Sequence, residues 1–257
     1  MSALVEVRGM HFRYGKVRDH STPWTLTDLS LDIRADSTLG IVGESGSGKS
    51  TLIRVLSGLL HHQQGSVMFD GRDLNDWLAK SPKDLRRRNQ IVFQSPRRSL
   101  DPRMNIGRSL SQPVRALEQR KPTKAEMTEW LARVGLGNEI LPRFPHQLSG
   151  GQLQRVGIAR ALSVGPDVLY ADEPVSALDV SVQAQVLNLL MDVRAQLGLT
   201  LVMVSHDLGV VSRLCEEVIV LKNGVVVEAG RTADVLANPQ DPYTVSLVAA
   251  ARTVSLT

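Results

Sequence analysis

The chain has 257 residues, of which 42% are hydrophobic and 22% charged, and its formal net charge is +4. This apolar fraction is enough for a folded core and excludes a wholly disordered protein, and the length suits one large domain or two small ones. The single cysteine, Cys215, excludes an internal disulfide and a cluster of cysteines that could bind a metal. The small excess of positive charge and the scarcity of aromatic residues disfavour nucleic-acid binding.

The predicted elements begin with β-strands. Residues 3–8 and 26–34 alternate apolar and polar side chains, which is typical of half-buried strands. A short apolar strand over residues 39–42 is followed by a glycine-rich turn and a helical run over residues 49–59. A further strand is expected at about residues 65–69.

The middle of the chain, from about residue 96 to residue 163, has a mainly helical pattern that prolines interrupt. The last third returns to strands and helices, with strands expected over residues 168–171, 199–204, 218–221 and 225–228 and a helix over residues 180–197. Uniformly apolar strands separated by helices favour a parallel sheet covered on both faces. We therefore predict an α/β fold in which a helical insert interrupts a mostly parallel sheet, with an N-terminal antiparallel β patch at its edge.

Residues 43–50, Gly-Glu-Ser-Gly-Ser-Gly-Lys-Ser, match the P-loop pattern in full and lie between a predicted strand and a predicted helix. The glycines let the backbone turn its N–H groups toward a triphosphate, and the helix N-terminus adds positive charge. The expected nucleotide-binding residues are Gly43, Glu44, Ser45, Gly46, Ser47, Gly48, Lys49, Ser50 and Thr51. Lys49 would lie between the terminal phosphates, and the hydroxyl of Ser50 is a candidate ligand of Mg²⁺.

A predicted buried strand over residues 168–171 is followed by two carboxylates, Asp172 and Glu173. The carboxyl end of a parallel strand is where ligands bind, so Asp172 is a candidate Mg²⁺ ligand. Glu173 could accept a proton from an attacking water. Taken alone, the pair could equally be the solvated cap of the next helix.

Residues 148–152, Leu-Ser-Gly-Gly-Gln, precede an apolar helical run. Ser149 is a good N-cap and the two glycines expose backbone amides, so this helix start is a second candidate anion site, although alone it could be a simple capped helix. A P-loop together with a separate phosphate-facing helix end suggests two chains that share one nucleotide.

Taken together, these motifs resemble the ATPase subunit of an ATP-binding cassette (ABC) transporter over nearly the whole chain. The corresponding segments are the Walker A loop at residues 43–50, the Q-loop at Gln94, the signature at Leu148, Ser149, Gly150, Gly151 and Gln152, the Walker B strand with its glutamate at residues 168–173, the D-loop at Ser176, Ala177, Leu178 and Asp179, and the H-loop at His206. The resemblance implies a P-loop NTPase fold of the RecA-like type.

The resemblance also implies roles for individual residues. Glu173, His206 and Gln94 would be catalytic, and Ser50, Gln94 and Asp172 would hold Mg²⁺. Tyr14 stands where the family places the aromatic ring that stacks on adenine, although it could also be a plain strand aromatic. Two subunits would face head to tail, so that each ATP lies between the P-loop of one and the signature of the other.

The family pattern implies a single ABC ATPase domain over residues 1–257. Residues 1–94 and 164–257 would form the catalytic core with the β patch, and residues 95–163 would form the helical subdomain that carries the signature.

Residues 93–103, 172–181 and 241–244 resemble the oligopeptide, dipeptide and nickel importer branch. The resemblance implies a subunit that hydrolyses ATP to drive uptake of peptides or nickel and other metal chelates, bound peripherally at the cytoplasmic face of the inner membrane. Its partners would be a second ABC ATPase subunit, two transmembrane permease subunits and a solute-binding protein, with no nucleic acid. ATP and Mg²⁺ are the expected cofactors. No iron–sulfur cluster is expected, because the C-terminal cysteines of many members of this branch are missing from this sequence.

Two alternatives share the same nucleotide chemistry. One is a soluble ABC ATPase that drives a cytosolic complex, as the carbon–phosphorus lyase accessory proteins do. The other is a nucleic-acid-associated ABC ATPase, which is disfavoured because such proteins carry two cassettes or a long coiled-coil insert.

Overall fold

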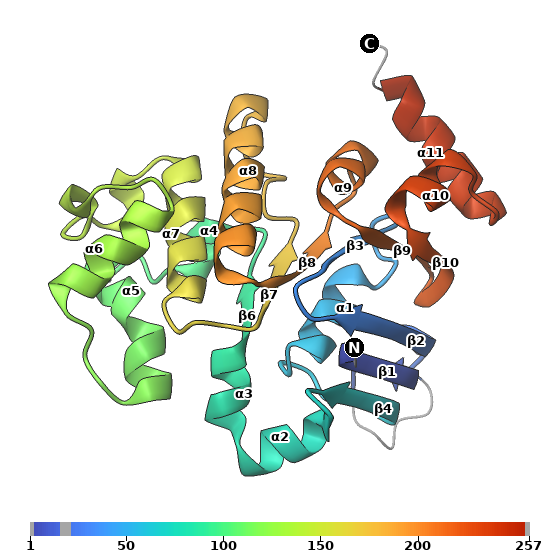
Figure 1. The fold of residues 1–257 in the computed structure, drawn as a ribbon, viewed down its shortest axis with the longest axis horizontal. Helices are drawn as coiled ribbons and strands as arrows, with labels where there is room; N and C mark the ends of the chain where they lie inside the picture. The colour runs from blue at the N-terminus through green and yellow to red at the C-terminus, as the bar shows by residue number, and fades with distance from the viewer. Residues whose placement is uncertain (1–2, 16–21, 255–257) are drawn as a thin grey trace. The chain divides into compact units, whose positions relative to one another are not determined.

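The computed structural model describes residues 3–15 and 22–254, which divide into two compact units (Figure 1). The first unit comprises Met1–Pro82 and Thr200–Thr257, and the second comprises Lys83–Leu199. The second unit therefore contains the segment 95–163 that we expect to be a helical subdomain, and it extends beyond that segment at both ends.

The N-terminal part of the first unit forms a four-stranded antiparallel sheet in the order β2-β1-β4-β5. Its strands are β1 (Ala3–Phe12), β2 (Leu26–Arg34), β4 (Gln64–Phe69) and β5 (Arg72–Asp73). Along β1 the side chains of Val5, Val7 and Met10 are buried, and Val7 pairs with both Leu31 and Val67. The predicted β patch is confirmed, with the alternation of apolar residues setting the buried face.

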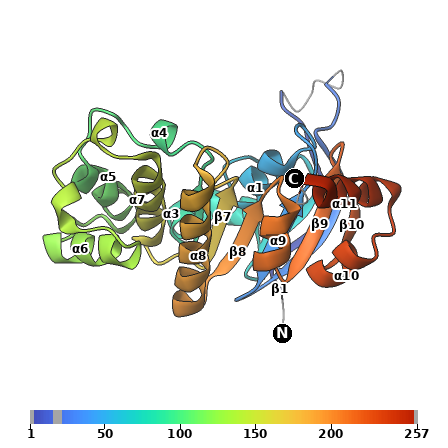
Figure 2. The same ribbon diagram turned by 90° about the horizontal axis from the view of Figure 1, so that it is seen from above.

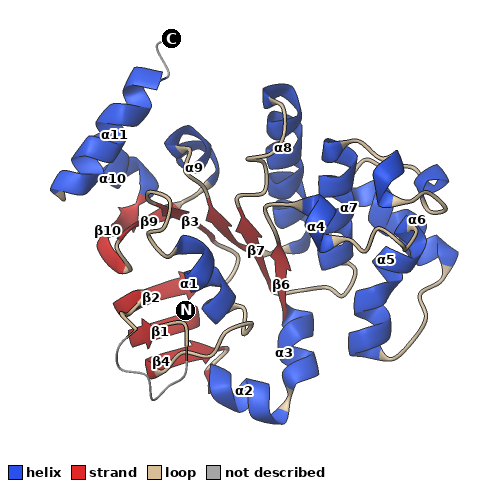
Figure 3. Ribbon diagram, turned by 180° about the vertical axis from the view of Figure 1, so that it is seen from behind, coloured by secondary structure: helices blue, strands red, loops and turns tan. Residues whose placement is uncertain are grey.

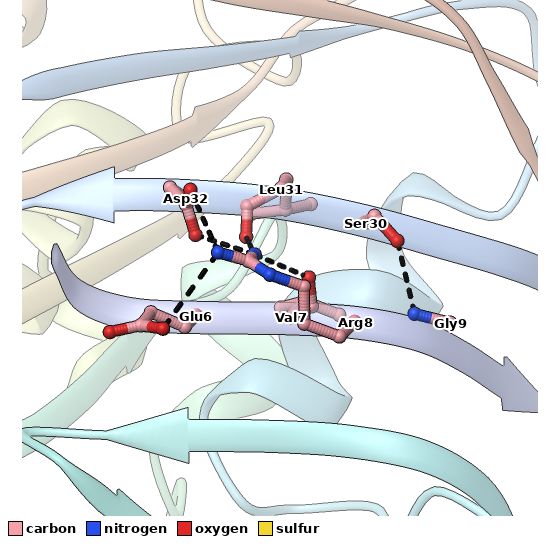
Figure 4. Close-up of polar contacts among 7 residues, drawn as sticks. All are labelled: Glu6, Val7, Arg8, Gly9, Ser30, Leu31 and Asp32. Atoms are coloured by element: carbon pink, nitrogen blue, oxygen red, sulfur yellow. Dashed lines mark hydrogen bonds and ion pairs between the residues drawn. The ribbon is translucent and has the colours of Figure 1, made fainter.

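The exposed face of this sheet is polar, and Figure 4 shows its contacts between β1 and β2. The Arg8 guanidinium donates two hydrogen bonds to the carboxylate of Asp32, at 2.6 and 3.0 Å, and lies 3.7 Å from Glu6. The hydrogen bond with Asp32 raises the pKa of Arg8. Because these groups are exposed, the pair contributes little to the stability of the fold.

The second sheet of the first unit is mostly parallel. Strand β3 (Thr38–Val42) pairs in parallel with β8 (Thr200–Val204) and β9 (Glu217–Lys222), and β9 forms an antiparallel hairpin with β10 (Val225–Arg231). The hairpin turns at Asn223 and Gly224, which both have positive φ, as the sequence pattern predicts.

Helices cover both faces of this second sheet. Helix α1 (Lys49–Leu56) lies between the two sheets of the first unit, whereas α9 (Leu208–Leu214), α10 (Thr232–Ala237) and α11 (Pro242–Val254) lie on the opposite side (Figure 3). Helix α1 ends earlier than the expected residue 59, because Gly58 adopts a φ of 75° just beyond it. Helix α2 (Leu74–Lys80) follows β5 and contacts β4 and β5 of the antiparallel sheet, and α3 (Pro82–Arg88) leads into the second unit.

The second unit combines two parallel strands with a helical region. Strand β6 (Asn89–Val92) pairs with β7 (Val168–Asp172). The α-helices are α4 (Pro96–Ser99), α5 (Ile106–Pro113), α6 (Lys124–Arg133), α7 (Gly150–Leu162) and α8 (Val180–Leu197), and the short helical turns are η1 (Val114–Glu118), η2 (Asn138–Ile140) and η3 (Pro145–Gln147).

Helix α7 is the centre of this helical region, because it contacts α4, α5, α6 and α8 (Figure 2). The mainly helical middle of the chain is thereby confirmed, and so is the mixed α/β fold class. No helix within the described part of the chain combines the length and the apolar character needed to cross a membrane.

Candidate active site

The P-loop follows the buried strand β3 and ends where α1 begins, as predicted. Two of its glycines are required by geometry. Gly43 has a φ of 148°, and a Cβ there would lie 2.1 Å from the carbonyl oxygen of Leu221. Gly48 has a φ of 104°, and a Cβ there would lie 2.7 Å from a methyl carbon of Leu26. The loop can therefore bring its backbone close to neighbouring strands and to a ligand only with glycine at these positions.

Lys49 is the buried cation of the loop, with 7% of its surface exposed. Its Nζ donates to the carbonyl oxygens of Gly43 at 2.8 Å and Glu44 at 2.7 Å. The hydroxyl of Ser47 is also buried, and it has no hydrogen-bond partner among the described residues. The loop thus holds an ammonium group and an unsatisfied hydroxyl beside the N-terminus of α1, which is a setting suited to phosphate.

An aromatic ring stands next to this helix start. Tyr14, just beyond β1, is 45% exposed, and its hydroxyl shares a hydrogen bond of 3.1 Å with Thr51 Oγ1. Its ring meets that of Phe12 edge-on, with centroids 5.0 Å apart. Ser50 lies at the same end of α1 and is half-buried. The structure therefore places Tyr14 beside the predicted nucleotide-binding residue Thr51.

The second unit holds the predicted carboxylates. Strand β7 is buried throughout and ends at Asp172, which is 5% exposed. The next residue, Glu173, adopts a φ of 44°, which is unusual for a side chain with a Cβ. Gln94 Nε2 donates to Glu173 Oε2 at 2.8 Å and to the Ser176 hydroxyl oxygen at 3.1 Å. Gln94 therefore connects the Q-loop to both the Walker B segment and the D-loop.

The predicted signature forms the start of α7. The Ser149 hydroxyl accepts a hydrogen bond from the Gln152 N–H at 3.2 Å, and the Gln152 side chain accepts one from the Ser149 N–H at 3.0 Å, which makes a capping box. Leu148, just before the cap, is buried. The N-cap predicted from the sequence is confirmed.

The signature glycines pack against the D-loop side of the same unit. A Cβ on Gly151 would lie 2.5 Å from Val182, at the start of α8, and a Cβ on Gly150 would lie 3.3 Å from Leu178. Small residues are needed here for packing as well as for access to the backbone. Asp179 ends the D-loop as the N-cap residue of α8.

His206 is exposed in the first unit, in the turn between β8 and α9. Asp207 shapes this turn, because its carboxylate accepts hydrogen bonds from the N–H groups of Gly209 and Val210 and thereby caps α9. The first unit thus holds the P-loop, Tyr14 and His206. The second holds Gln94, Asp172, Glu173, the signature and the D-loop.

Tyr243 contacts the P-loop but is not among the predicted site residues. The hydroxyl of Tyr243, on α11, accepts a hydrogen bond from the backbone N–H of Glu44 at 2.8 Å. The segment 241–244 does stand out as a resemblance to one importer branch, but nothing in its pattern indicates contact with a loop about 200 residues earlier.

Comparisons with known proteins agree with this arrangement. A family model described as ABC transporter matches residues 26–176. The chain is 46% identical over 251 residues to the Brucella ovis protein named "Putative peptide import ATP-binding protein", an alignment that covers 96% of this chain and 78% of the relative. It is 42% identical over 226 residues to the oligopeptide transport ATP-binding protein OppF of Haemophilus influenzae, covering 87% of this chain and 68% of that protein.

A solved structure shows the same fold. The dimeric, post-hydrolysis form of the ATP-binding cassette MJ0796 bound to ADP and Pi superposes with a TM-score of 0.78 at 29% identity, covering 89% of this chain and 98% of that one. With the P-loop, signature and Walker B strand placed as described, these matches show that the chain belongs to the ABC transporter family and has the fold of its ATP-binding cassettes.

Proposed function

We propose that this protein is the ATP-hydrolysing subunit of an ABC importer for peptides. The observation that carries the proposal is the loop of residues 43–48, in which glycines in the left-handed region lead to buried Lys49 at the start of α1. The names of relatives with 42% and 46% identity, peptide import and oligopeptide transport ATP-binding proteins, favour an importer over a soluble complex.

The P-loop residues 43–51 would bind the phosphates of ATP. The amides at the start of α1 would face the phosphate oxygens, Lys49 would move its hydrogen bonds from loop carbonyls to phosphate, and the buried Ser47 hydroxyl would gain a partner. Tyr14, with its exposed ring, would stack on adenine.

Mg²⁺ fits the donor set that the chain offers. Ser50, Asp172 and Gln94 would hold it through a hydroxyl, a carboxylate and an amide oxygen, which are the hard ligands that this ion prefers. When bound, the ion would neutralise charge on the terminal phosphates.

Glu173 is the proposed general base, which accepts a proton from the attacking water. Its carboxylate is held by Gln94, which fixes the direction from which the proton is taken. The positive φ of Glu173 is maintained by the surrounding turn, in which the Ser176 N–H donates to the Glu173 carbonyl at 3.3 Å. His206 would contact the γ-phosphate and position the water.

The signature of a second subunit would complete each site. In this chain the Ser149 side chain caps α7 through the Gln152 amide, and the amides of Gly150 and Gly151 belong to the first turn, which has no acceptor within the helix. These amides would bind the γ-phosphate held by the partner. The similar cassette MJ0796 is dimeric in its form bound to ADP and Pi, which supports an arrangement of two subunits.

The proposed assembly contains a second ABC ATPase of the same or a related kind, two permease subunits and a solute-binding protein. The chain would bind the permeases peripherally at the cytoplasmic face of the inner membrane. ATP would favour the closed ATPase dimer and hydrolysis would release it, so that the permeases alternate between two states.

The test has two stages. The purified chain should hydrolyse ATP with Mg²⁺, and Lys49→Ala should abolish ATP binding, whereas Lys80→Ala, which removes an exposed lysine from α2, should not. The tagged chain should then be isolated from its membranes with its permeases, and ATP hydrolysis by that complex should rise when the binding protein is added with peptide. Recovery of the chain only in a soluble complex, or stimulation by nickel chelates and not by peptides, would contradict the proposal.

A further inference from the structure

The C-terminal helix α11 contacts the P-loop through the side chain of Tyr243. Tyr243 lies in the first turn of α11 and is 8% exposed, and its hydroxyl oxygen lies 2.8 Å from the backbone nitrogen of Glu44. Both residues belong to the first unit. A backbone N–H in a loop has no partner within a helix or sheet ladder, and here its acceptor is a side chain 199 positions away.

This hydrogen bond is one of several that hold the backbone of Glu44 in place. Its N–H donates to Tyr243, and its carbonyl oxygen accepts hydrogen bonds from Lys49 Nζ at 2.7 Å and from the Ser47 N–H at 3.2 Å. The backbone of Glu44 is thus held at both ends. Because the same carbonyl accepts a hydrogen bond from Lys49, a shift of Glu44 would also move the ammonium group from the position it holds before ATP binds.

Tyr243 is itself held by several groups. Lys222 Nζ lies over its ring at 4.7 Å from the centroid, and the Asp241 carboxylate accepts a hydrogen bond from the Tyr243 N–H at 2.8 Å. The turn before α11 is anchored to β10, because the Glu228 carboxylate accepts hydrogen bonds from the N–H groups of Gln240 at 2.9 Å and Asp241 at 3.0 Å. The hydroxyl therefore has a defined position.

We infer that Tyr243 is a positioning residue of the nucleotide site, which couples the C-terminal helix to the P-loop through Glu44. This inference rests on the proposed ATP-binding role of the loop. Tyr243 does not touch the reacting atoms, and the loop binds phosphates alike before and during hydrolysis. Loss of the hydroxyl should therefore weaken ATP binding and leave the chemical step unchanged.

The variant that tests this is Tyr243→Phe, which keeps the ring beneath Lys222 and removes only the hydroxyl. The matched control is Ser246→Ala, which removes a hydroxyl that donates to the Pro242 and Tyr243 carbonyls on the same helix without reaching the P-loop. Nucleotide affinity is measured by titration with ATP and Mg²⁺, and kcat and KM come from phosphate release.

For Tyr243→Phe we expect Kd and KM for ATP to rise about three- to tenfold with kcat within twofold of wild type, as loss of one neutral hydrogen bond predicts. Ser246→Ala should resemble wild type. Equal ATP affinity in Tyr243→Phe and wild type, or a fall in kcat at unchanged KM, would overturn the inference. If wild type itself does not bind ATP, it is the proposed function that fails.

A second measurement needs no variant. Hydrogen exchange of the Glu44 amide in the wild-type chain should be slow relative to that of Ser45, because the Glu44 N–H is bonded to Tyr243. Equal exchange of the two amides would show that this hydrogen bond does not persist in solution, and the inference would then be wrong.

Discussion

The amide of Gln94 lies 2.8 Å from the carboxylate of Glu173, although 79 positions separate the two residues. The same amide is 3.1 Å from the hydroxyl of Ser176. One glutamine therefore joins the segment after β6, the segment after β7 and the D-loop. A movement of the Q-loop would therefore change the orientation of the Glu173 side chain, the proposed base.

Replacing the proposed base tests its role. We expect Glu173→Gln to reduce kcat for ATP about 10²- to 10⁴-fold, as loss of a general base does, while ATP binding persists. The variant should also accumulate as an ATP-bound dimer in size-exclusion chromatography. Glu129→Gln, which changes an exposed carboxylate on α6, is the control and should behave as wild type. Near-normal hydrolysis by Glu173→Gln would remove Glu173 from this role.

A variant of Gln94 tests its contacts with Glu173 and Ser176 together with its proposed place at Mg²⁺. Gln94→Ala removes the hydrogen bonds to Glu173 and Ser176 and the proposed amide ligand of Mg²⁺. We expect kcat to fall about tenfold or more, because the carboxylate is no longer held in one direction and the ion loses a ligand. Gln90→Ala removes a similar amide on β6 that donates instead to the Arg86 carbonyl. Steady-state phosphate release should separate the two variants, and equal activity would contradict the role of Gln94.

The P-loop glycines make a prediction about stability. Gly43→Ala places a Cβ 2.1 Å from a backbone oxygen at a φ of 148°, so we expect a loss of about 3 kcal/mol of folding stability. Gly71→Ala also has a positive φ, of 71°, but open space around its Cβ, and should cost only about 1 kcal/mol. The stabilities of the two variants are compared by thermal unfolding without nucleotide. An equal loss of folding stability at both positions would show that the backbone near Leu221 moves aside at little energetic cost.

The anchor of α11 predicts a dependence of stability on pH. Partial burial acts to raise the pKa of Glu228, but hydrogen bonds from the backbone amides of Gln240 and Asp241, together with the nearby Thr244 hydroxyl, outweigh it, so the pKa lies below its usual value of 4.5. A carboxylate with a lowered pKa stabilises the folded state above its unfolded pKa, and this contribution disappears as the pH falls through the folded pKa.

Glu228→Gln should therefore melt at a lower temperature than wild type at pH 7, and the difference should shrink below about pH 4. Melting curves of both proteins between pH 7 and pH 3 provide the measurement. A difference that stays constant over this range would mean that the charge of Glu228 is not what anchors the turn.

The single cysteine provides a probe of unfolding. Burial, and then the nearby charge of Glu216, raise the pKa of Cys215 to about 12, and its side chain is 6% exposed. Because the thiolate is the reactive form, iodoacetamide at pH 8 should label the native chain very slowly and the denatured chain completely. Mass spectrometry follows the reaction, and fast labelling of the native chain would contradict the buried position of the thiol.

The sequence alone determined those features in which the interacting residues are close together along the chain. The P-loop is one, because its glycines, Lys49 and the following helix are consecutive. The capping box of Ser149 and Gln152 is another, since both partners lie within one helical turn. The buried strands β3, β7 and β8 were predictable because they are apolar throughout, and the hairpin before β10 because Asn223 and Gly224 tolerate positive φ.

Only the tertiary structure decided which distant residues meet. The elements α2, α3 and β6 lie in a polar, arginine-rich stretch without clear periodicity, and pairing with β7 is what makes β6 a strand. The contact of Gln94 with Glu173 and that of Tyr243 with Glu44 join residues that no local pattern relates. The sequence by itself determined that a nucleotide loop exists, because phosphate binding needs consecutive amides. The contacts that support this loop and orient the proposed base join residues far apart in the sequence, so they form only when the chain folds.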